Sequence, residues 1–502
     1  MEQIDKVGRV STSTDALESS ELARPISTSH RVPSQRPFQP ASRIGDSTTE
    51  ERWVTGDNFG LRIPADPEAL MAAGPEFLTT AFHAAGALDP SNSVTAIVES
   101  SEFFDGGSGK KLKLTVAYER PDTALPERLF VKFSRHFDNE LWDSAKWMML
   151  SEVNFALLSR SSEFPVMVPL LMFADLEASS DTGLLITELI PYGEGTVEPA
   201  HAKCMDYLIP DAVEHYRAIF RSLGRLSGAH RAGKLAPEFD DGFPDAEQGS
   251  AQFRIPVSDE VSVRRANRMF DFIQRYPKLF PEHLHDPALR AQFIDYMADV
   301  FAARDRINEN LLSGHPHLVA FGHWNGNIDN SWFERDVHGE LQCGFIDWAN
   351  CGQLPVTQIV VGALSCAEPY VWADHLDELL GIFIEEFEAQ GAQLDAAGPQ
   401  LRFASRPIGG SNSNRQAGSG TRKLNLDELS LHVRLSMASN FGLSMAAPVA
   451  IARDIDDIDA VTGSRDPIFR NRYSSRVMLH SMTLMLENWQ ALKLGKLVRQ
   501  LR

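Results

Sequence analysis

Two short polar segments carry the side chains best suited to hold a metal ion beside a phosphate. The first reads GHWNGNIDNSWF and supplies His323, Asn325 and Asn330; the second reads CGFIDWANCG and supplies Asp347. We predict two short strands joined by a tight turn, which brings the Asn330 amide and the Asp347 carboxylate together across the hairpin. Two such oxygen ligands, completed by water and phosphate oxygens, suit Mg²⁺, which loses its water reluctantly. The pair therefore predicts a magnesium site.

A lysine and a glutamate earlier in the chain could bind and orient a nucleotide. Lys132 lies in the apolar run LFVKFS, and Glu152 follows about twenty residues later, among apolar neighbours of a predicted helix at Asp143–Arg160. Phosphoryl transfer needs a cation on the phosphates, and a strand lysine paired with a helix glutamate provides one. For either residue alone, the commoner interpretation is an edge-strand lysine or a solvated helix glutamate.

The elements that must position these residues come in an informative order. Alternating and apolar runs broken by turn residues predict an antiparallel meander, then a helix and one more strand, and then mainly helices. The sequence thus predicts an α+β fold in which a small β-rich part precedes a large helical part. The predicted strands are Val94–Ser101, Lys111–Tyr118, Arg128–Ser134 and Leu184–Ile190, followed by helices at His215–His230 and Ala288–Leu312.

Taken together, these motifs resemble the aminoglycoside phosphotransferase and choline kinase-like group of the protein kinase-like superfamily. The family pattern is H-G-D, four residues, then N, with I-D-W or I-D-F some fifteen to twenty residues later. Here the triplet HWN at His323 matches in part, Asn330 matches the later asparagine, and the IDW around Asp347 matches closely. The helix LGRLSGAH resembles the one that usually precedes the site. The resemblance covers roughly Val94 to Ala367.

The resemblance implies a bilobal kinase-like fold, with a small antiparallel β-rich N-lobe, a large mainly helical C-lobe, and ATP and Mg²⁺ as cofactors. It implies that His323 and Asn325 lie at the catalytic position. The loop 102–109 either covers the nucleotide or is a plain hairpin turn. The remaining implied roles are phosphate binding by Lys132, its orientation by Glu152, Mg²⁺ binding by Asn330 and Asp347, and adenine contacts from the backbone of Glu188, Leu189 and Ile190.

The sequence departs from the family pattern at the base position, where Asn325 replaces aspartate. An amide cannot accept the proton of an acceptor hydroxyl, although it can orient that hydroxyl, and a general base is worth roughly 10²–10⁴-fold in rate. Asp329 is a weak substitute, because in a hairpin it would face solvent when Asn330 faces the metal. GQLP after Asp347 also replaces the usual G-D-P. Two hypotheses follow: a phosphotransferase acting on a hydroxyl of a small molecule, or a pseudokinase or nucleotide-binding module.

Composition narrows the class of partner and the compartment. The formal net charge of -20 and the lack of a long basic run argue against nucleic-acid binding. The four cysteines are too few and too irregular for a disulfide framework or a zinc site, which suits a reducing cytoplasm. No apolar stretch reaches the roughly 18 residues of a membrane span, so no membrane insertion is expected. We therefore expect a cytoplasmic protein with a small-molecule substrate.

Shifts in composition suggest where the chain divides. Ser, Thr, Pro and Arg dominate the first fifty residues, which cannot bury enough apolar surface to order themselves. His315 and His317, beside Pro316, are interpreted as surface-loop residues. Neither the acceptor nor the oligomeric state is specified by any pattern. The predicted parts are a disordered tail at 1–50, an N-terminal nucleotide-binding lobe at 51–190, a helical C-lobe with the catalytic loop at 191–401, a flexible linker or loop at 402–423, and a C-terminal helical part at 424–502.

Overall fold

The computed structural model describes residues 52–103, 109–243, 258–308, 318–392, 394–395, 421–422, 424–439 and 447–501. Some predictions from the sequence lie outside these residues. They are the tail at 1–50, most of the glycine-rich loop at 102–109, the loop histidines His315 and His317, and most of the linker at 402–423.

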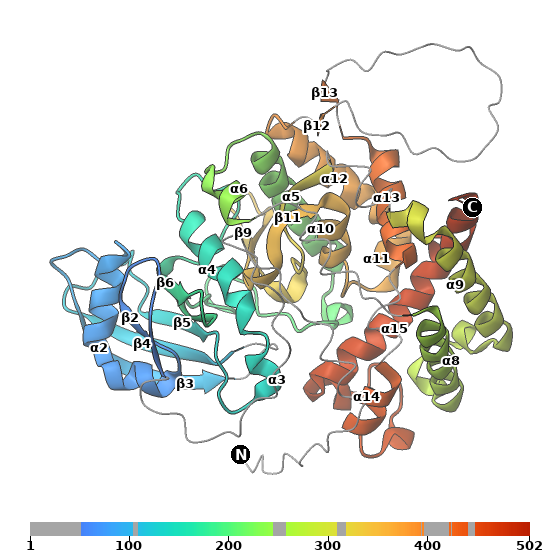
Figure 1. Cartoon of the computed structure of the whole chain (residues 1–502), viewed down its shortest axis with the longest axis horizontal. Helices are drawn as coiled ribbons and strands as arrows, with labels where there is room; N and C mark the ends of the chain where they lie inside the picture. Colours follow the sequence, from blue (N-terminus) through green and yellow to red (C-terminus); the bar gives the residue numbers. More distant parts are fainter. Residues whose placement is uncertain are drawn as a thin grey trace.

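A five-stranded antiparallel sheet forms one end of the molecule (Figure 1). Its strands run in the order β3-β4-β5-β7-β6, so that β5 lies in the middle. A two-stranded ribbon of β1 and β2 precedes it along the chain. The strands are β1 (Trp53–Thr55), β2 (Arg62–Pro64), β3 (Val94–Phe103), β4 (Lys111–Tyr118), β5 (Arg128–Phe133), β6 (Leu171–Glu177) and β7 (Thr182–Glu188).

Each face of this sheet is covered by a different helix. Helix α2 (Pro67–Ala84) packs on one face, where its apolar side chains share a core with Leu129, Val131 and Phe133 of β5. Helix α4 (Met149–Leu158) packs on the other face. Because successive side chains of a strand point to opposite faces, Lys132 is directed toward α4. The alternation of side chains along β5 therefore decides which helix can supply a partner for Lys132.

Helix α5 (Ala212–Arg231) is the central support of the helical part. It packs along α12 (Leu376–Ala389) at such close range that a Cβ on Gly224 or Gly228 would lie about 2.5 Å from a backbone oxygen of α12. On another face, Ser222 donates to the Cys343 carbonyl at 2.9 Å. The segment LGRLSGAH thus lets α12 approach, and Ser222 just before it braces the strand that leads to Asp347.

Two short antiparallel strand pairs carry the polar segments singled out in the sequence. Strand β8 (Val319–His323) pairs with β11 (Cys351–Pro355), and β9 (Ser331–Arg335) pairs with β10 (Leu341–Phe345). The β9–β10 hairpin is thus inserted between the two strands of the other pair. Single turns of 3₁₀ helix connect them, η7 (Ile328–Asn330) before β9 and η8 (Trp348–Asn350) before β11. Asn330 and Asp347 therefore both lie at the same end of the β9–β10 hairpin.

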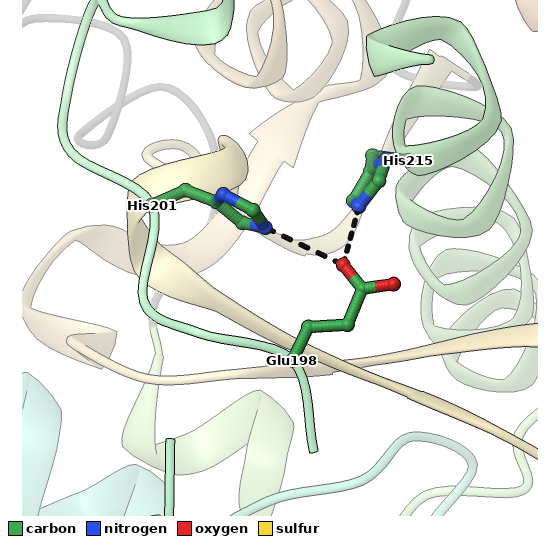
Figure 2. Close-up of side chains that lie close together, drawn as sticks. All are labelled: Glu198, His201 and His215. Carbon is green, nitrogen blue, oxygen red and sulfur yellow. Dashed lines mark hydrogen bonds and ion pairs between the residues drawn. The ribbon is translucent and has the colours of Figure 1, made fainter. Parts of the chain in front are cut away.

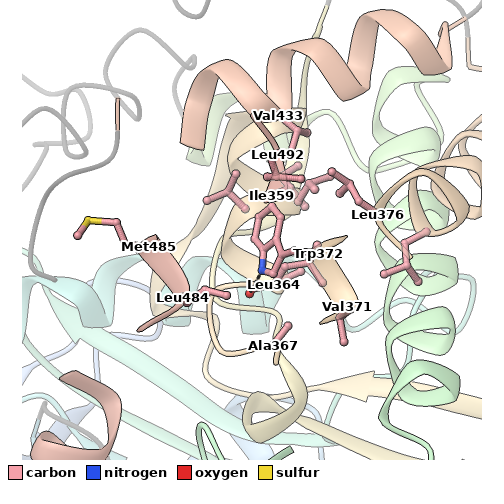
Figure 3. Packing of buried hydrophobic residues seen from close by; sticks show 14 of the residues in the cluster. Ile359, Leu364, Ala367, Val371, Trp372, Leu376, Val433, Leu484, Met485 and Leu492 are labelled. Carbon is pink, nitrogen blue, oxygen red and sulfur yellow. Dashed lines mark hydrogen bonds between the residues drawn. The ribbon is translucent and has the colours of Figure 1, made fainter. Parts of the chain in front are cut away.

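The C-terminal helices share one apolar core with α5 and α12. Figure 3 shows part of it around Trp372, whose indole N–H donates to the Leu364 carbonyl at 2.9 Å while Val433 and Leu484 come from distant helices. The other helices are α3 (Glu140–Asp143), α6 (Glu238–Gly242), α8 (Asp259–Arg275), α9 (Pro287–Asn308), α10 (Val356–Ala363), α11 (Pro369–Asp374), α13 (Leu426–Ser439), α14 (Ala447–Asp454), α15 (Tyr473–Ala491) and α16 (Leu494–Leu501), and a last pair of strands is β12 (Leu394–Asp395) and β13 (Thr421–Arg422).

The predicted α+β architecture, a small antiparallel sheet followed by a large helical part, is confirmed. The sequence failed to predict α2 and β6. The helix expected at Asp143–Arg160 is shorter, because α3 ends at Asp143 and a 3₁₀ turn precedes α4, which begins at Met149. All four cysteines are buried free thiols. Among the described helices, none combines the length and the apolar character that a membrane crossing requires.

Candidate active site

Lys132, Glu152 and Asp347 meet between the sheet and the β9–β10 hairpin. Lys132 Nζ lies 2.7 Å from Glu152 Oε2 and 3.3 Å from Asp347 Oδ1. The side chains of Lys132 and Glu152 are only 5% and 4% exposed. These three residues thus form one charged group, in which one cation lies between two carboxylates. Lys132 and Asp347 are 215 positions apart in the sequence.

Lys132 is not an edge-strand lysine and Glu152 is not a solvated helix glutamate, so both of these alternative interpretations are wrong. Strand β5 is central in the sheet and α4 turns Glu152 inward, so neither side chain is a solvated surface group. Burial alone would lower the pKa of Lys132, but Glu152 and Asp347 outweigh it and raise that pKa. Burial raises the pKa of Glu152 against the opposing pull of Lys132. The lysine is therefore a permanent cation held by the fold.

Asp347 occupies a strained and partly open position. Its φ of 59° lies in the left-handed region, which aspartate tolerates better than most residues other than glycine. Burial opposes ionisation, but Lys132 and His323 lower the pKa of Asp347 to about 2. Its side chain remains 41% exposed. An ionised carboxylate is thus turned toward space that a ligand can reach.

His323 organises the loop between β8 and β9. Its ring is fully buried against Trp348, and Nε2 lies 3.0 Å from the Ile346 carbonyl while Nδ1 accepts from the Asn325 N–H at 3.1 Å. These contacts require the neutral ring with its proton on Nε2. Burial lowers the pKa of His323 to about 4, so the ring stays neutral near pH 7. The ring links the backbone on either side of the site.

Asn330 and Asp347 provide oxygen ligands of the kind that Mg²⁺ prefers. The Ile346 N–H donates to the Asn330 carbonyl at 2.9 Å, which places Asp347 next to this pair. The Asn330 side-chain nitrogen donates to the Asn325 carbonyl at 2.9 Å, so its amide oxygen points away from that carbonyl. One amide oxygen and one ionised carboxylate are the donor types that such an ion would need.

Asp329 is buried, and the expectation that it faces solvent is wrong. Residues Ile328–Asn330 form a 3₁₀ turn rather than a strand, so neighbouring side chains do not alternate between two faces. The Asp329 side chain is 15% exposed and lies 3.1 Å from Lys203 Nζ. The same Nζ is 3.4 Å from Asn325 Oδ1. Burial raises the pKa of Asp329, which favours a carboxylate able to take a proton.

Lys203 is the residue of this site that sequence reasoning missed. It lies in the irregular segment before α5, without a periodic pattern or motif around it. Arg476 of α15 donates to its carbonyl at 2.7 Å and so fixes the segment from a helix 273 residues later. Burial would lower the pKa of Lys203, but Cys366 and Asp329 raise it. A hydrogen bond with Cys204 and the charge of Lys203 in turn lower the pKa of the Cys366 thiol.

The predicted adenine segment has only some of its backbone groups available. The Glu188 N–H donates to the Leu170 carbonyl and the Leu189 N–H to the Arg128 carbonyl, both at 2.9 Å. The Ile190 carbonyl accepts from the Tyr192 N–H at 2.9 Å, and the Glu188 carbonyl accepts from Thr187 Oγ1 at 3.0 Å but keeps a second lone pair. A nucleotide could therefore use the carbonyl groups of Glu188 and Leu189 and the Ile190 N–H. Gly109 lies in the loop between β3 and β4 and has a φ of 60°. A Cβ at this position would collide with the Phe133 carbonyl. The fold itself requires that glycine.

A cavity of about 610 Å³ lies next to the predicted adenine segment. Glu188 and Ile190 line it together with Val168, Trp332 and Cys343. Neither Lys132 nor Asp347 is among its lining residues, so it is distinct from the charged group. Lys132 and Asp347 thus contact each other directly, whereas Glu188 and Ile190 line a separate opening.

Comparison with known proteins finds only distant likeness. No protein-family model matches the chain, and no curated protein matches it. Among solved structures, choline kinase from Cryptosporidium parvum has 12% identity and a TM-score of 0.38, covering 79% of this chain and 89% of that one. An aminoglycoside phosphotransferase from Alicyclobacillus acidocaldarius has 12% identity and a TM-score of 0.37, with coverages of 81% and 93%.

A third solved structure is a choline/ethanolamine kinase family protein from Mesorhizobium loti. It has 11% identity and a TM-score of 0.36, and the match covers 84% of this chain and 98% of that one. These are kinases of the two kinds that the motifs resemble. Likeness at this level carries no conclusion about activity, which has to follow from the geometry of the site.

Proposed function

We propose that this protein is an ATP- and Mg²⁺-dependent phosphotransferase that moves the γ-phosphate of ATP to a hydroxyl of a small molecule. The observation that carries the proposal is the position of Lys132 Nζ, 2.7 Å from Glu152 and 3.3 Å from Asp347. A buried strand lysine oriented by a helix glutamate and facing a metal-binding aspartate is the arrangement that kinases use for nucleotide phosphates.

In this proposal the group formed by Lys132, Glu152 and Asp347 is the site that binds the phosphates of ATP. Lys132 exchanges its contact with Asp347 for the α- and β-phosphates, and Glu152 holds it in place. Asn330 and Asp347 would hold Mg²⁺, which neutralises charge on the phosphate oxygens when bound. The carbonyl groups of Glu188 and Leu189 and the Ile190 N–H are the proposed adenine contacts.

The acceptor hydroxyl is assigned to the group around Asn325. The Asn325 amide can hydrogen-bond the hydroxyl, and the bond from its N–H to His323 fixes its backbone. Asp329 is a neighbouring carboxylate, since both it and Asn325 contact Lys203 Nζ. We propose that Asp329 takes the proton that Asn325 cannot, and that Lys203 supports the charge that develops there.

The test begins with nucleotide binding by the full chain. Calorimetric titration with a non-hydrolysable ATP analogue and Mg²⁺ is expected to show binding in the natural protein and none for Lys132→Met. Lys113→Met is the matched control, because Lys113 is an exposed lysine on the neighbouring strand β4. Equal binding by both variants would contradict the assignment of Lys132.

Transfer is then measured with ATP labelled at the γ-phosphate and a panel of hydroxylated small molecules. Asp347-dependent labelling of at least one compound is expected. Asp240→Asn, which changes a carboxylate with a 70% exposed side chain far along the chain, is the control. Nucleotide binding without transfer to any compound would count against a phosphotransferase and favour a nucleotide-binding module.

A further inference from the structure

A second group of metal-ligand side chains lies outside the nucleotide site, where the segment before α5 meets the first turn of that helix. Glu198 and His201 belong to the segment and His215 to α5, and Figure 2 shows their side chains pointing toward one another. Glu198 Oε2 is 2.7 Å from His215 Nε2 and 3.5 Å from His201 Nε2. All three ligand atoms lie within 4.8 Å of one another.

The hydrogen bonding of His215 calls for a positive charge in this group. Its Nδ1 lies 2.9 Å from the Asp211 carbonyl, which can only accept, so Nδ1 carries a proton. In the neutral ring Nε2 then has a lone pair, and it faces a carboxylate oxygen of Glu198 at 2.7 Å. Either a second proton or a metal ion must lie between these two electron-rich atoms. A metal-bound imidazole commonly donates its other N–H to such a carbonyl.

His201 favours the metal ion over the proton. Its Nε2 is buried and makes no hydrogen bond within the described part of the chain. A proton shared by His215 and Glu198 would leave this atom with only the 3.5 Å approach to Glu198 Oε2, which is long for a hydrogen bond, whereas a metal ion would use all three ligands.

The backbone holds the three residues in place before any ligand binds. The Glu198 N–H donates to the Phe333 carbonyl at 2.8 Å, and its own carbonyl accepts from Gly193 at 3.2 Å. The rings of His215 and His201 lie 4.6 and 5.9 Å from the Phe333 ring. No lysine or arginine among the described residues forms an ion pair with Glu198. The carboxylate is therefore reserved for the two imidazoles.

We propose that Glu198, His201 and His215 bind one Zn²⁺ ion or a similar divalent transition metal. Two imidazole nitrogens and one carboxylate oxygen suit zinc, whereas magnesium and calcium prefer oxygen ligands alone. The Glu198 and His201 side chains are 25% and 19% exposed, which leaves a fourth position for water. This metal would be separate from the one proposed at Asn330 and Asp347.

The metal would tie the segment before α5 to that helix. Lys203 follows His201 by two residues, and its Nζ contacts both Asn325 and Asp329. Zinc would thereby hold Lys203 beside the proposed acceptor site without touching the reacting atoms. The site itself does not depend on the proposed function, because its test measures metal and not activity.

Metal binding is tested on the full chain after treatment with a chelator and return of ZnCl₂. One equivalent of zinc is expected after desalting, and Co²⁺ in its place should give the visible absorption of a four-coordinate site. His201→Gln and Glu198→Gln are expected to weaken zinc binding by at least about 100-fold, the upper end of the cost of losing an outer-shell partner alone. Competition with a chromophoric zinc chelator measures this.

The matched control is His283→Gln, which removes a histidine that has a single carboxylate partner, Glu487, at 2.9 Å. Its zinc affinity should equal that of the natural protein. His201 lies in a loop, so His201→Gln should unfold at the same temperature as the natural protein when the chelator is present. Zinc retained in both ligand variants, or no zinc bound by the natural protein, would overturn the proposal.

Discussion

The two buried lysines of the site, Lys132 and Lys203, are neutralised from different parts of the fold. Lys132 comes from the central strand of the sheet, and its first partner, Glu152, comes from the helix packed on that sheet. Lys203 comes from an irregular segment, and its partner Asp329 lies in a single 3₁₀ turn. The first pair is set by regular elements, and the second depends on loops held by distant helices.

The two pairs also differ in how far their side chains are exposed, which suits one pair to hold a fixed reactant and the other to face a variable one. The side chains of Lys132 and Glu152 are at most 5% exposed, whereas those of Lys203 and Asp329 are 12% and 15% exposed. A rigid scaffold with variable loops is a common way to keep one reactant fixed and change the other. We therefore expect nucleotide binding to depend on the first pair and acceptor choice on the second.

The largest expected effect is on stability, from Lys132→Met. The change leaves Glu152 buried without its cation, which should cost about 3–5 kcal/mol of unfolding free energy. Lys203→Met should cost less, about 1–3 kcal/mol, because water can reach its partner more easily. Urea unfolding of both variants measures the two values.

The double variant Lys132→Met/Glu152→Met is the control for this interpretation. It removes the buried Glu152 carboxylate that Lys132→Met leaves unpaired, and it should be more stable than Lys132→Met alone. A double variant that is less stable than either single one would mean that packing, not charge, dominates at this position. Equal losses for Lys132→Met and Lys203→Met would remove the contrast between the two lysines.

The second prediction concerns the rate of transfer. Asp347→Asn should lower kcat by about 10³-fold, because a lost metal ligand removes several kcal/mol of charge stabilisation. Asp329→Asn should lower it by about 10²-fold, the lower range for a general base. Its KM for ATP should stay unchanged, while that of Asp347→Asn should rise. A larger rate loss in Asp329→Asn would reverse the assigned roles.

The third prediction is a pH dependence from His323, which connects the two lysine groups. Its pKa is about 4 in the folded protein and 6.5 ordinarily, so between these values the unfolded chain binds more protons. Stability should therefore fall as pH drops from 6.5 to 4, by about 3 kcal/mol from this residue, and not change further below. It should not depend on this ring above pH 6.5.

Unfolding of His323→Gln across that pH range measures the effect. The slope should become shallower but not vanish, because burial also lowers the pKa of His480 to about 4. His338→Gln, at the exposed turn between β9 and β10, should keep the natural slope. An unchanged slope in His323→Gln would mean that the ring is protonated in the folded state.

The smallest effect is expected from Asn325→Asp. The new carboxylate would lie near Lys203 Nζ, 3.4 Å from the present amide oxygen, and would share the cation with Asp329. We expect kcat to rise by about 10-fold, less than the full share of a general base, because Asp329 already serves. A fall in kcat would show that the amide orients the acceptor in a way that a carboxylate cannot.

The residues of this site that lie on a regular strand or helix could be predicted from the sequence. Lys132 in LFVKFS and Glu152 on the next helix were identified because strand and helix periodicity fix which face each side chain occupies. The same reasoning failed for Asp329, because a strand rule was applied to a 3₁₀ turn. Lys203 gave no signal, since its position depends on contacts with Arg476 and the turn at Asp329.

The three-residue group at His201 shows the same limit. Glu198 and His201 are three residues apart in a segment without helical or strand periodicity, and His215 is fourteen residues later. Their spacing matches no familiar metal motif. They converge only because β9 and Phe333 hold the segment against α5.

The sequence by itself determined the order of sheet and helices, the pairing of a strand lysine with a helix glutamate, and the hairpin that brings Asn330 and Asp347 to one end. These depend on local periodicity and on motifs, which a single chain displays directly. Only the tertiary structure decided that Asp347 is left-handed and ionised, that Asp329 is buried with Lys203, and that two histidines meet Glu198. Those features depend on burial and on contacts between remote segments, where desolvation and nearby charge, not residue type, set the chemistry.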